Sequence, residues 1–362
     1  MAWHQTKLTE MLKISYPIIQ AGMAGGVTSP ELVATVSNVG GLGTLGAGYL
    51  SPDAMRQAIR DIRKRTDQPF AVNLMVPQPY KHDSSIEQQM KKRLRKFEEV
   101  VEAPTDEETG GSPISFEDQV NVVLEEKVPV FSFTFGIPDS FVIQKLHSNQ
   151  TIVIGTATTV KEAVELEKSG VDAVVAQGSE AGGHRGTFQS SSDFPYIGTI
   201  ALVPQIVDNV NIPVIASGGI MDGRGVLASL SLGAAGVQMG SAFLTTLESN
   251  AHEKHKKALI QSSDESTVIT TAFSGRPARG VKNTFIQEME RYPGSIPPYP
   301  VQNALTKKMR KHAAKQGNPE YMSLWGGQAA SLSRLGSTEE LMKKIFQQVD
   351  QLIGKLANSG GV

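Results

Sequence analysis

Eight short apolar segments alternate with helical patterns along the first two thirds of the chain, and this alternation constrains the fold more than any other feature. The segments are bounded by Gly, Pro or polar residues, and most are apolar on both faces, which is typical of parallel strands covered by helices. We predict strands at residues 17–22, 42–48, 70–76, 129–136, 151–157, 172–178, 213–220 and 236–243.

The segments between these strands begin and end as helices do. In residues 29–41, Ser29 is a predicted cap and Pro30 fits the first turn. In residues 158–170, Gly170 is predicted to end the helix. The pattern therefore predicts an α/β fold, a (β/α)8 TIM barrel, with an open doubly wound sheet as the alternative.

Two regions interrupt the alternation. Residues 91–119 contain a charged helical pattern, a polar loop and the start of another helix, which we interpret as solvated decoration. Residues 248–325 contain GRPARG and a Pro-rich stretch and do not resemble a barrel unit, so we predict an inserted lid or substrate region there. The predicted organisation is a barrel over 1–247, this lid, and a helical closure over 326–362 that opens with a Ser337/Glu340 capping box.

Composition and charge exclude several classes of function. The net charge is −1 over 362 residues, without long basic blocks, so we expect no nucleic-acid partner. No apolar run reaches about 18 residues and the N-terminus lacks a signal-peptide pattern, so we expect a soluble, cytoplasmic protein without a membrane partner. The chain has no cysteine, which excludes thiolate metal sites and cysteine nucleophiles.

Two motifs are better explained by structure than by function. Gly41, Gly43 and Gly46 match the dinucleotide pattern GxGxxG, but they follow a predicted helix and lead into a strand, the reverse of the order that pattern needs. We therefore predict a helix stop and a tight barrel strand. His252 and His255 lie one turn apart without a third ligand, so we predict a solvated helix face and no metal site.

Glycine-rich turns follow the predicted strands one, six, seven and eight, at the end of a barrel where active sites lie. Backbone N–H groups in such turns favour a phosphate-bearing ligand, although a barrel also needs glycines at turns. The stretch QGSEAGGHRGTF (177–188) places His184 directly after a glycine pair. We predict that His184 is catalytic, either as a protonated hydrogen-bond donor or as a neutral base.

Five ordered segments carry a family resemblance: QAGMAGGVTSPELVATVSNVGGLGTLGAG, GVDAVVAQGSEAGGHRG, IPVIASGGIMDG, GAAGVQMGSAFL and SGRPARG. Together they resemble the nitronate monooxygenase family, formerly 2-nitropropane dioxygenase, of FMN-dependent TIM-barrel enzymes. The likeness runs from about residue 8 to beyond Trp325. It implies bound FMN and oxidation of alkyl nitronates or nitroalkanes by O2, with propionate 3-nitronate as a candidate substrate.

The resemblance also implies the site residues. His184 takes the catalytic position. The implied FMN contacts are Gly22, Met23, Asn73, Gln177, Gly182, Gly219, Gln238, Met239, Gly240 and Ser241. Glu180 is expected to accept local N–H groups and Arg185 to anchor a loop. Tyr292, Tyr299 and Arg279 are expected to select a substrate carboxylate.

Three other families are considered. The FMN-dependent enoyl-acyl-carrier-protein reductase, which uses NAD(P)H, is the runner-up; we expect its members to be shorter and to lack a region like 248–325. An inosine-monophosphate dehydrogenase needs a nucleophilic cysteine, which this chain lacks. A non-enzymatic FMN-binding protein would not need His184. The oligomeric state is left open, with a homodimer as one alternative.

Overall fold

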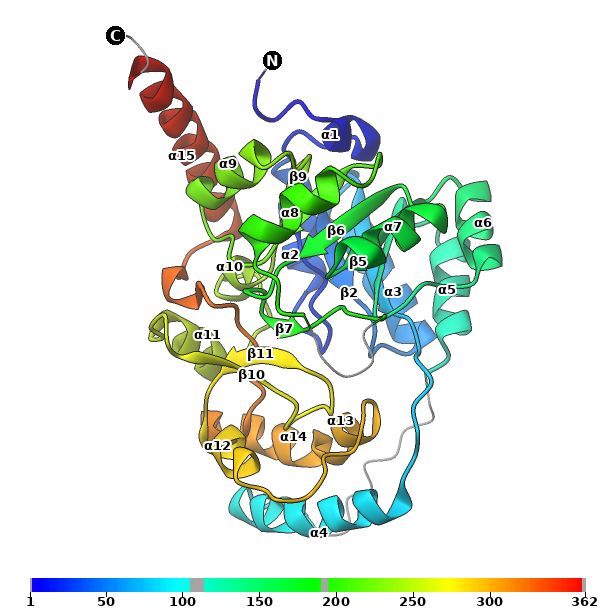
Figure 1. Ribbon diagram of the computed structural model, residues 1–362, viewed down its shortest axis with the longest axis vertical. Coiled ribbons are helices and arrows are strands. Elements are labelled where there is room, and N and C mark those ends of the chain that lie inside the picture. Colours follow the sequence, from blue (N-terminus) through cyan, green and yellow to red (C-terminus); the bar gives the residue numbers. More distant parts are fainter. Residues whose placement is uncertain (1, 105–113, 190–194, 360–362) are drawn as a thin grey trace.

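The computed structural model describes residues 2–104, 114–189 and 195–359. All eight predicted strands are present and form one parallel sheet with the order β1-β9-β8-β6-β5-β4-β3-β2 (Figure 1). They are β1 (Ile18–Gln20), β2 (Gly43–Gly46), β3 (Phe70–Met75), β4 (Val130–Thr134), β5 (Ile152–Ala157), β6 (Ala173–Gln177), β8 (Val214–Ser217) and β9 (Gly236–Met239).

The two outer strands of this order, β1 and β2, meet and close the sheet. Leu42 N–H donates to Ile18 O at 2.9 Å, and Gln20 N–H donates to Leu42 O at 2.9 Å. These bonds form a parallel bridge between Ile19 and Leu42. The predicted TIM barrel is therefore confirmed, and the doubly wound alternative is wrong.

The amino end of the barrel is filled by apolar side chains. Leu8 and Leu12 of α1 (Lys7–Leu12) are buried against strand residues that include Ile19, Val130 and Ile215. The helix α1 lies beside the amino ends of the strands in Figure 1. Because this end is plugged, a ligand site can form only at the carboxyl end.

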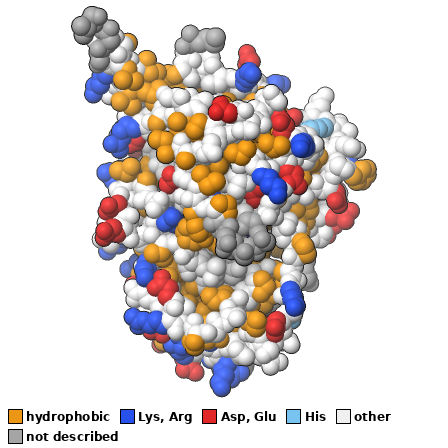
Figure 2. Space-filling view, viewed as in Figure 1, with side chains coloured by type: hydrophobic (Ala, Val, Ile, Leu, Met, Phe, Trp, Pro, Cys, Tyr) orange, Lys and Arg blue, Asp and Glu red, His pale blue; other side chains and the backbone are white. Residues whose placement is uncertain are grey.

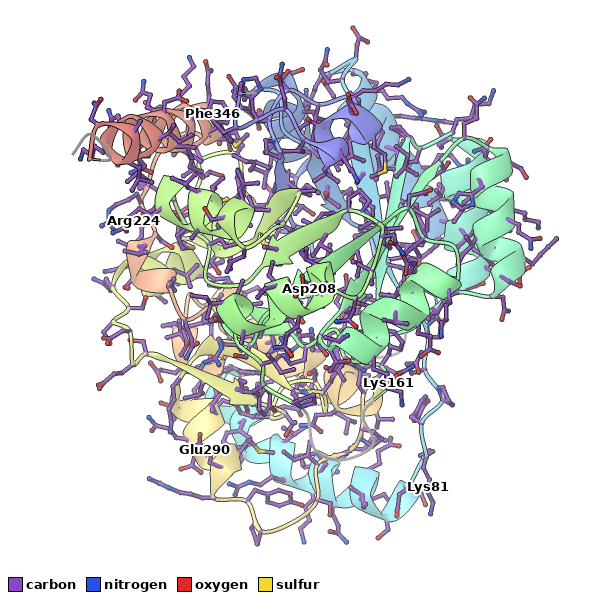
Figure 3. All side chains as sticks on the ribbon, turned by 45° about the horizontal axis from the view of Figure 1, so that its top comes forward. Lys81, Lys161, Asp208, Arg224, Glu290 and Phe346 are labelled. Carbon is purple, nitrogen blue, oxygen red and sulfur yellow. The ribbon has the colours of Figure 1, made fainter. Side chains whose placement is uncertain are left out.

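Helices surround the sheet on its outer face. They are α2 (Pro30–Asn38), α3 (Pro52–Arg63), α5 (Phe116–Glu125), α6 (Ser140–Ser148), α7 (Val160–Lys168), α8 (Thr199–Val207), α9 (Gly223–Ser231) and α15 (Thr338–Ser359). Lys161 on α7, Asp208 after α8 and Arg224 on α9 lie on the outer surface in Figure 3. Figure 2 shows side chains of both charges interspersed over one face. Within the described residues, no helix is long and apolar enough to cross a membrane.

Local capping signals act as predicted. The Ser29 hydroxyl accepts the Leu32 N–H at 2.9 Å, at the start of α2. At the start of α15, Ser337 N–H donates to Glu340 Oε2 at 3.0 Å and Glu340 N–H donates to Ser337 Oγ at 3.2 Å. This reciprocal pair is the predicted capping box, and α15 then packs against α9 and α2.

The GxGxxG match is structural, as predicted. A Cβ on Gly43 would lie 2.0 Å from Val33 O, and one on Gly46 would lie 2.4 Å from the carbonyl carbon of Met23. The Val33 oxygen belongs to α2 and the Met23 carbon to the turn after β1, so neither atom can move away without distorting the backbone there. Glycine at both positions therefore allows β2 to approach its neighbours.

A second unit lies against the carboxyl end of the barrel, below the sheet in Figure 1. Its three-stranded antiparallel sheet has the order β10-β11-β7. Its elements are β7 (Gly183–His184), α4 (Ser84–Val100), α11 (Glu253–Ile260), β10 (Thr267–Thr270), β11 (Ala278–Val281), α12 (Thr284–Glu290), α13 (Val301–Leu305), α14 (Lys307–Lys315), and the 3-10 turns η1 (Pro319–Tyr321) and η2 (Ala330–Leu332). The short helix α10 (Ser241–Leu244), directly after β9, packs in the barrel core through Ala242 and Phe243. The division at residues 247/248 and 325/326 stays a proposal.

The interpretation of residues 91–119 as solvated decoration is wrong for α4. Met90, Leu94 and Phe97 are buried in the core of the second unit, where the Phe97 ring packs edge-on against Phe285 with centroids 5.0 Å apart. Charged residues of α4 also contact this unit, since Lys96 pairs with Glu288 at 2.7 Å and Glu98 with Lys308 at 2.9 Å. Residues 105–113 of that stretch lie outside the described residues.

Replacing Phe97 with alanine tests this packing. Phe97 is 3 % exposed, so Phe97→Ala should lower the free energy of unfolding by about 3–5 kcal/mol. Val100, on the same helix, is 54 % exposed, and Val100→Ala should change it by less than about 0.5 kcal/mol. Urea denaturation followed by circular dichroism measures both, and equal effects would contradict a buried α4 face.

Candidate active site

The implied site residues gather at the carboxyl ends of five barrel strands. Gly22 and Met23 follow β1, Asn73 lies in β3, and Gln177 ends β6. Gly219 follows β8, Gln238 and Met239 end β9, and Gly240 and Ser241 come directly after it. His184 and Gly182 reach the same end through the loop after β6, as β7 pairs with the second unit.

Several of these residues lie in close contact with residues at the ends of other strands. A Cβ on Gly22 would lie 2.5 Å from Cβ of Asn73, and one on Gly240 would lie 3.8 Å from Sδ of Met23. Ser241 Oγ accepts the Gly327 N–H at 2.9 Å. The predicted residues therefore form one continuous rim around the carboxyl end.

Two segments distant in sequence hold the loop that carries His184. In the first, β7 pairs with β11, so that His184 lies opposite Ala278 of the GRPARG motif. The second loop is WGGQ (325–328), where Gln328 N–H donates to Glu180 O at 2.9 Å. Gly182 lies where these chains cross, since a Cβ there would lie 2.6 Å from Gly327 N. Only a glycine fits at this crossing.

Gln177 fixes the turn that carries His184. Its amide Nε2 donates to His184 O at 3.1 Å, and its Oε1 accepts the Gly186 N–H at 2.8 Å. Gly183 adopts a left-handed φ of 73°, which glycine tolerates without strain. The side chain that we expected to contact a flavin thus also positions the histidine.

Aromatic rings surround the His184 side chain. Phe135, Tyr299 and Trp325 have ring centroids 5.8, 6.0 and 5.5 Å from the imidazole. Phe135 has a φ of 77°, a conformation that costs an aromatic residue roughly 1–2 kcal/mol. This strain places the Phe135 ring between His184 and the Arg276 guanidinium, whose carbon lies 3.9 Å from the ring centroid.

The surroundings keep His184 neutral. Burial, followed by the positive charges of Arg276 and Arg310, lowers the pKa of His184 to about 3. Burial also lowers the pKa of Arg276 to about 10, so its guanidinium is still charged at neutral pH. Among the described residues, neither arginine forms an ion pair with a carboxylate. The site therefore combines a neutral imidazole with two guanidiniums that form no ion pair within the described residues.

Sequence reasoning missed Ser274, Phe135, Arg276 and Arg310. His184 Nε2 lies 2.9 Å from Ser274 Oγ. Ser274 and Arg276 flank the glycine of GRPARG, so their place beside a recognised motif was an available signal. Phe135 and Arg310 carried no comparable signal.

Of the three side chains expected to select a carboxylate, Tyr299 alone has a recorded ring contact with His184. Arg279 instead donates from Nε to Ser179 O at 3.0 Å and is buried in β11. The Arg93 guanidinium lies over the Tyr292 ring, 5.6 Å from its centroid, in the second unit. The role given to Arg279 and Tyr292 therefore passes to Arg276 and Arg310 in our proposal.

Several neighbouring residues have the structural roles expected of them. Both Glu180 oxygens accept the Thr199 N–H, at 2.8 and 2.9 Å. Arg185 anchors its loop, with Nη1 donating to Gln177 O at 2.9 Å. The prediction of a solvated face at His252 and His255 is wrong for His255, which is buried with Nε2 2.8 Å from Trp325 O.

The rim has the features that a flavin phosphate and ring need. Gly218 and Gly219 have left-handed φ values of 118° and 72°, which turn the backbone sharply after β8. Gly240 precedes α10 without a side-chain cap, so no side chain occupies the first amide groups of that helix. The Thr44 hydroxyl is buried beside Gly22 without a hydrogen-bond partner among the described residues. Met239 is buried, so a contact there would come from its backbone.

Comparison with known proteins gives consistent results. A family model described as nitronate monooxygenase matches residues 5–348. The chain is 49 % identical over 358 residues to a protein named probable nitronate monooxygenase from Staphylococcus aureus (strain Newman), covering 97 % of this chain and 99 % of the relative. It is similar to the solved structure of nitroalkane oxidase from Streptomyces ansochromogenes, with a TM-score of 0.88, 40 % identity, and 96 % and 99 % of the two chains covered.

More distant structures bear on the runner-up family. FabK from Thermotoga maritima aligns with a TM-score of 0.78 and 34 % identity, covering 98 % of this chain and 99 % of its own. An enoyl reductase domain of MlnA from Bacillus amyloliquefaciens shares the fold, with a TM-score of 0.65 and 14 % identity, over 97 % and 98 % of the chains. The expectation that enoyl reductases are shorter is therefore wrong for this domain.

The lowered pKa of His184 predicts a change in stability with pH. Below pH 6.5 the unfolded chain protonates this histidine while the folded chain does not, so stability falls as the pH decreases from 6.5 towards 3. At pH 5 one such group lowers the free energy of unfolding by up to about 2 kcal/mol. In His184→Asn the decrease in unfolding free energy between pH 7 and pH 5, measured by urea denaturation, should be smaller by about 1–2 kcal/mol. An unchanged decrease would contradict a neutral, buried His184.

Proposed function

Because the chain belongs to the nitronate monooxygenase family, we propose that it binds FMN and uses O2 to oxidise alkyl nitronates to nitrite and a carbonyl product. Family membership makes it an oxidoreductase that acts on nitronates in general. FMN, O2 as oxidant and the particular substrate are the proposed part. The single observation that carries the proposal is a neutral His184 under the positive charge of Arg276 and Arg310, which form no ion pair among the described residues.

The residues of the rim divide into two proposed roles. Backbone N–H groups at Gly219, Gly240 and Ser241 hold the phosphate, since Gly219 turns the backbone sharply after β8 and α10 begins after Gly240 without a side-chain cap. The amides of Asn73 and Gln177 face the polar edge of the ring, although each also bonds within the protein. Bound there, the flavin accepts electrons from the substrate and passes them to O2.

The charges favour an anionic substrate. A nitronate carries a negative charge on its nitro oxygens, and in surroundings of low polarity a guanidinium attracts that charge more strongly than it does in water. Arg276 and Arg310 are half-buried, and neither forms an ion pair with a carboxylate among the described residues. Propionate 3-nitronate, with a second negative charge, fits the same field.

The enoyl reductase remains the second candidate function, since a protein named as such shares the fold over nearly its full length. Its substrate is an enoyl thioester, which carries no charge at the reacting carbons. The two positive charges that act on His184 would not recognise such a group. The arrangement of charge therefore favours the nitronate.

An anaerobic titration decides between the two functions. Mass spectrometry of the flavin released from the purified protein should first identify FMN rather than FAD. Under anaerobic conditions ethyl nitronate or propionate 3-nitronate should then bleach the flavin absorbance, and O2 should restore it with release of nitrite. Rapid stoichiometric reduction by NADPH, with no response to either nitronate, would favour the reductase.

The variant His184→Asn is the control for this titration. It should retain flavin, because the proposed phosphate and ring contacts lie on other residues. Its turnover should be lower by about a hundredfold or more if His184 takes part in proton transfer or charge stabilisation. Loss of flavin together with activity would instead indicate a structural histidine.

Substitution of Arg276 tests the selection of an anion. Arg276→Gln removes the positive charge, so KM for propionate 3-nitronate should rise by about tenfold or more, while KM for neutral nitroethane should change by less than about threefold. Arg276→Lys retains the charge and should recover most of the affinity. Steady-state nitrite release gives KM for the unsubstituted protein and the two variants. An equal rise in KM for both substrates would contradict a role of Arg276 in selecting an anion.

A further inference from the structure

The hydroxyl of Ser274 has three polar neighbours, and together they determine where the proton of His184 lies. Ser274 Oγ lies 3.0 Å from Arg276 O, accepts the Arg276 N–H at 3.3 Å and lies 2.9 Å from His184 Nε2. A serine hydroxyl has one proton to donate, and a carbonyl oxygen can only accept. Within the described residues Arg276 O has no other donor, so it receives the Ser274 proton.

We propose that Ser274 is a positioning residue that holds His184 in the tautomer with its proton on Nε2, leaving the Nδ1 lone pair for the substrate. The inference rests on the proposed function, because it concerns the form in which that substrate enters. With its own proton directed to Arg276 O, Ser274 Oγ accepts from His184 Nε2–H. His184 Nδ1 forms no hydrogen bond within the described residues. The two roles expected for His184, donor and base, are thereby separated.

The base role follows from this tautomer. When a neutral nitroalkane binds, its α C–H bond breaks, the proton forms a bond with Nδ1, and the electron pair moves into the nitro group to give the nitronate. An imidazolium and an anion thus form from two neutral groups. The guanidiniums of Arg276 and Arg310 stabilise the anion, while Tyr299, whose pKa burial raises, stays neutral.

A preformed nitronate needs no proton removal. Its oxidation therefore does not depend on the Nδ1 lone pair, whereas oxidation of the parent nitroalkane does. Replacing Ser274 should accordingly lower the rate of nitroalkane oxidation more than the rate of nitronate oxidation. A merely structural role for Ser274 would affect them alike.

The tautomer can be read directly by NMR. In the flavin-bound protein labelled with 15N-histidine at pH 7.5, the His184 resonances, assigned by their absence in His184→Asn, should show a protonated Nε2 and an unprotonated Nδ1. Ser274→Ala should give a mixture of both tautomers. A proton on Nδ1 in the unsubstituted protein, or an unchanged tautomer in Ser274→Ala, would overturn the proposal.

Kinetics with a matched pair of substrates provide the second test. For Ser274→Ala, kcat/KM with neutral nitroethane should fall by about tenfold or more, while kcat/KM with ethyl nitronate should fall by less than about threefold. Ser274→Thr, which keeps a hydroxyl, should recover most of the nitroethane activity. Ser263→Ala removes an exposed hydroxyl elsewhere and serves as the matched control.

The outcomes of these tests separate the two proposals. Equal losses with nitroethane and ethyl nitronate in Ser274→Ala would overturn the positioning role while leaving nitronate oxidation intact. If the unsubstituted protein oxidises neither substrate, the proposed function fails. The NMR measurement still decides the tautomer in that case, because it does not depend on turnover.

Discussion

The closure of the barrel between β1 and β2 is the constraint on which the site depends. Two backbone hydrogen bonds to Leu42 join the first strand to the second, and so bring the carboxyl ends of all eight strands into one ring. Without that closure Gly22, after β1, would not lie against Asn73 in β3. The close packing of β2 relies in turn on Gly43 and Gly46, where a side chain would collide with backbone atoms.

The second constraint is electrostatic. Holding two half-buried guanidiniums without an ion pair among the described residues is unfavourable, and Arg276 reduces that cost by donating to Arg185 O and by lying over the Phe135 ring. Burial, followed by the positive charge that remains, lowers the pKa of His184. A neutral imidazole and a positive potential thus arise from the same arrangement. The strained φ of Phe135 lies at this point, directly after β4.

The barrel was predictable from sequence because its signals are local. Apolar runs, the Ser29 cap and the Ser337/Glu340 box each act within a few residues, and each is found as predicted. The burial of α4 was not predictable, although Met90, Leu94 and Phe97 share one helix face, because their packing partners come from residues 268–325. The same limit explains why Ser274 was missed. Its meeting with His184 depends on the pairing of β7 with β11, which no local pattern specifies.

A shared scaffold can therefore support different chemistry. The phosphate site that we propose at the strand-end glycines would serve either reaction, so it does not distinguish a nitronate oxidase from an enoyl reductase of the same fold. In our proposal the groups that distinguish them come from the second unit: Ser274, Arg276 and Arg310 all lie beyond the last barrel strand. The segment around Ser274 and Arg276 lies near His184 because β7, in the loop after β6, pairs with β11. The specificity of the site is thus determined at the contact between the two units, where a small shift of β11 would move the charge and the tautomer-setting hydroxyl together.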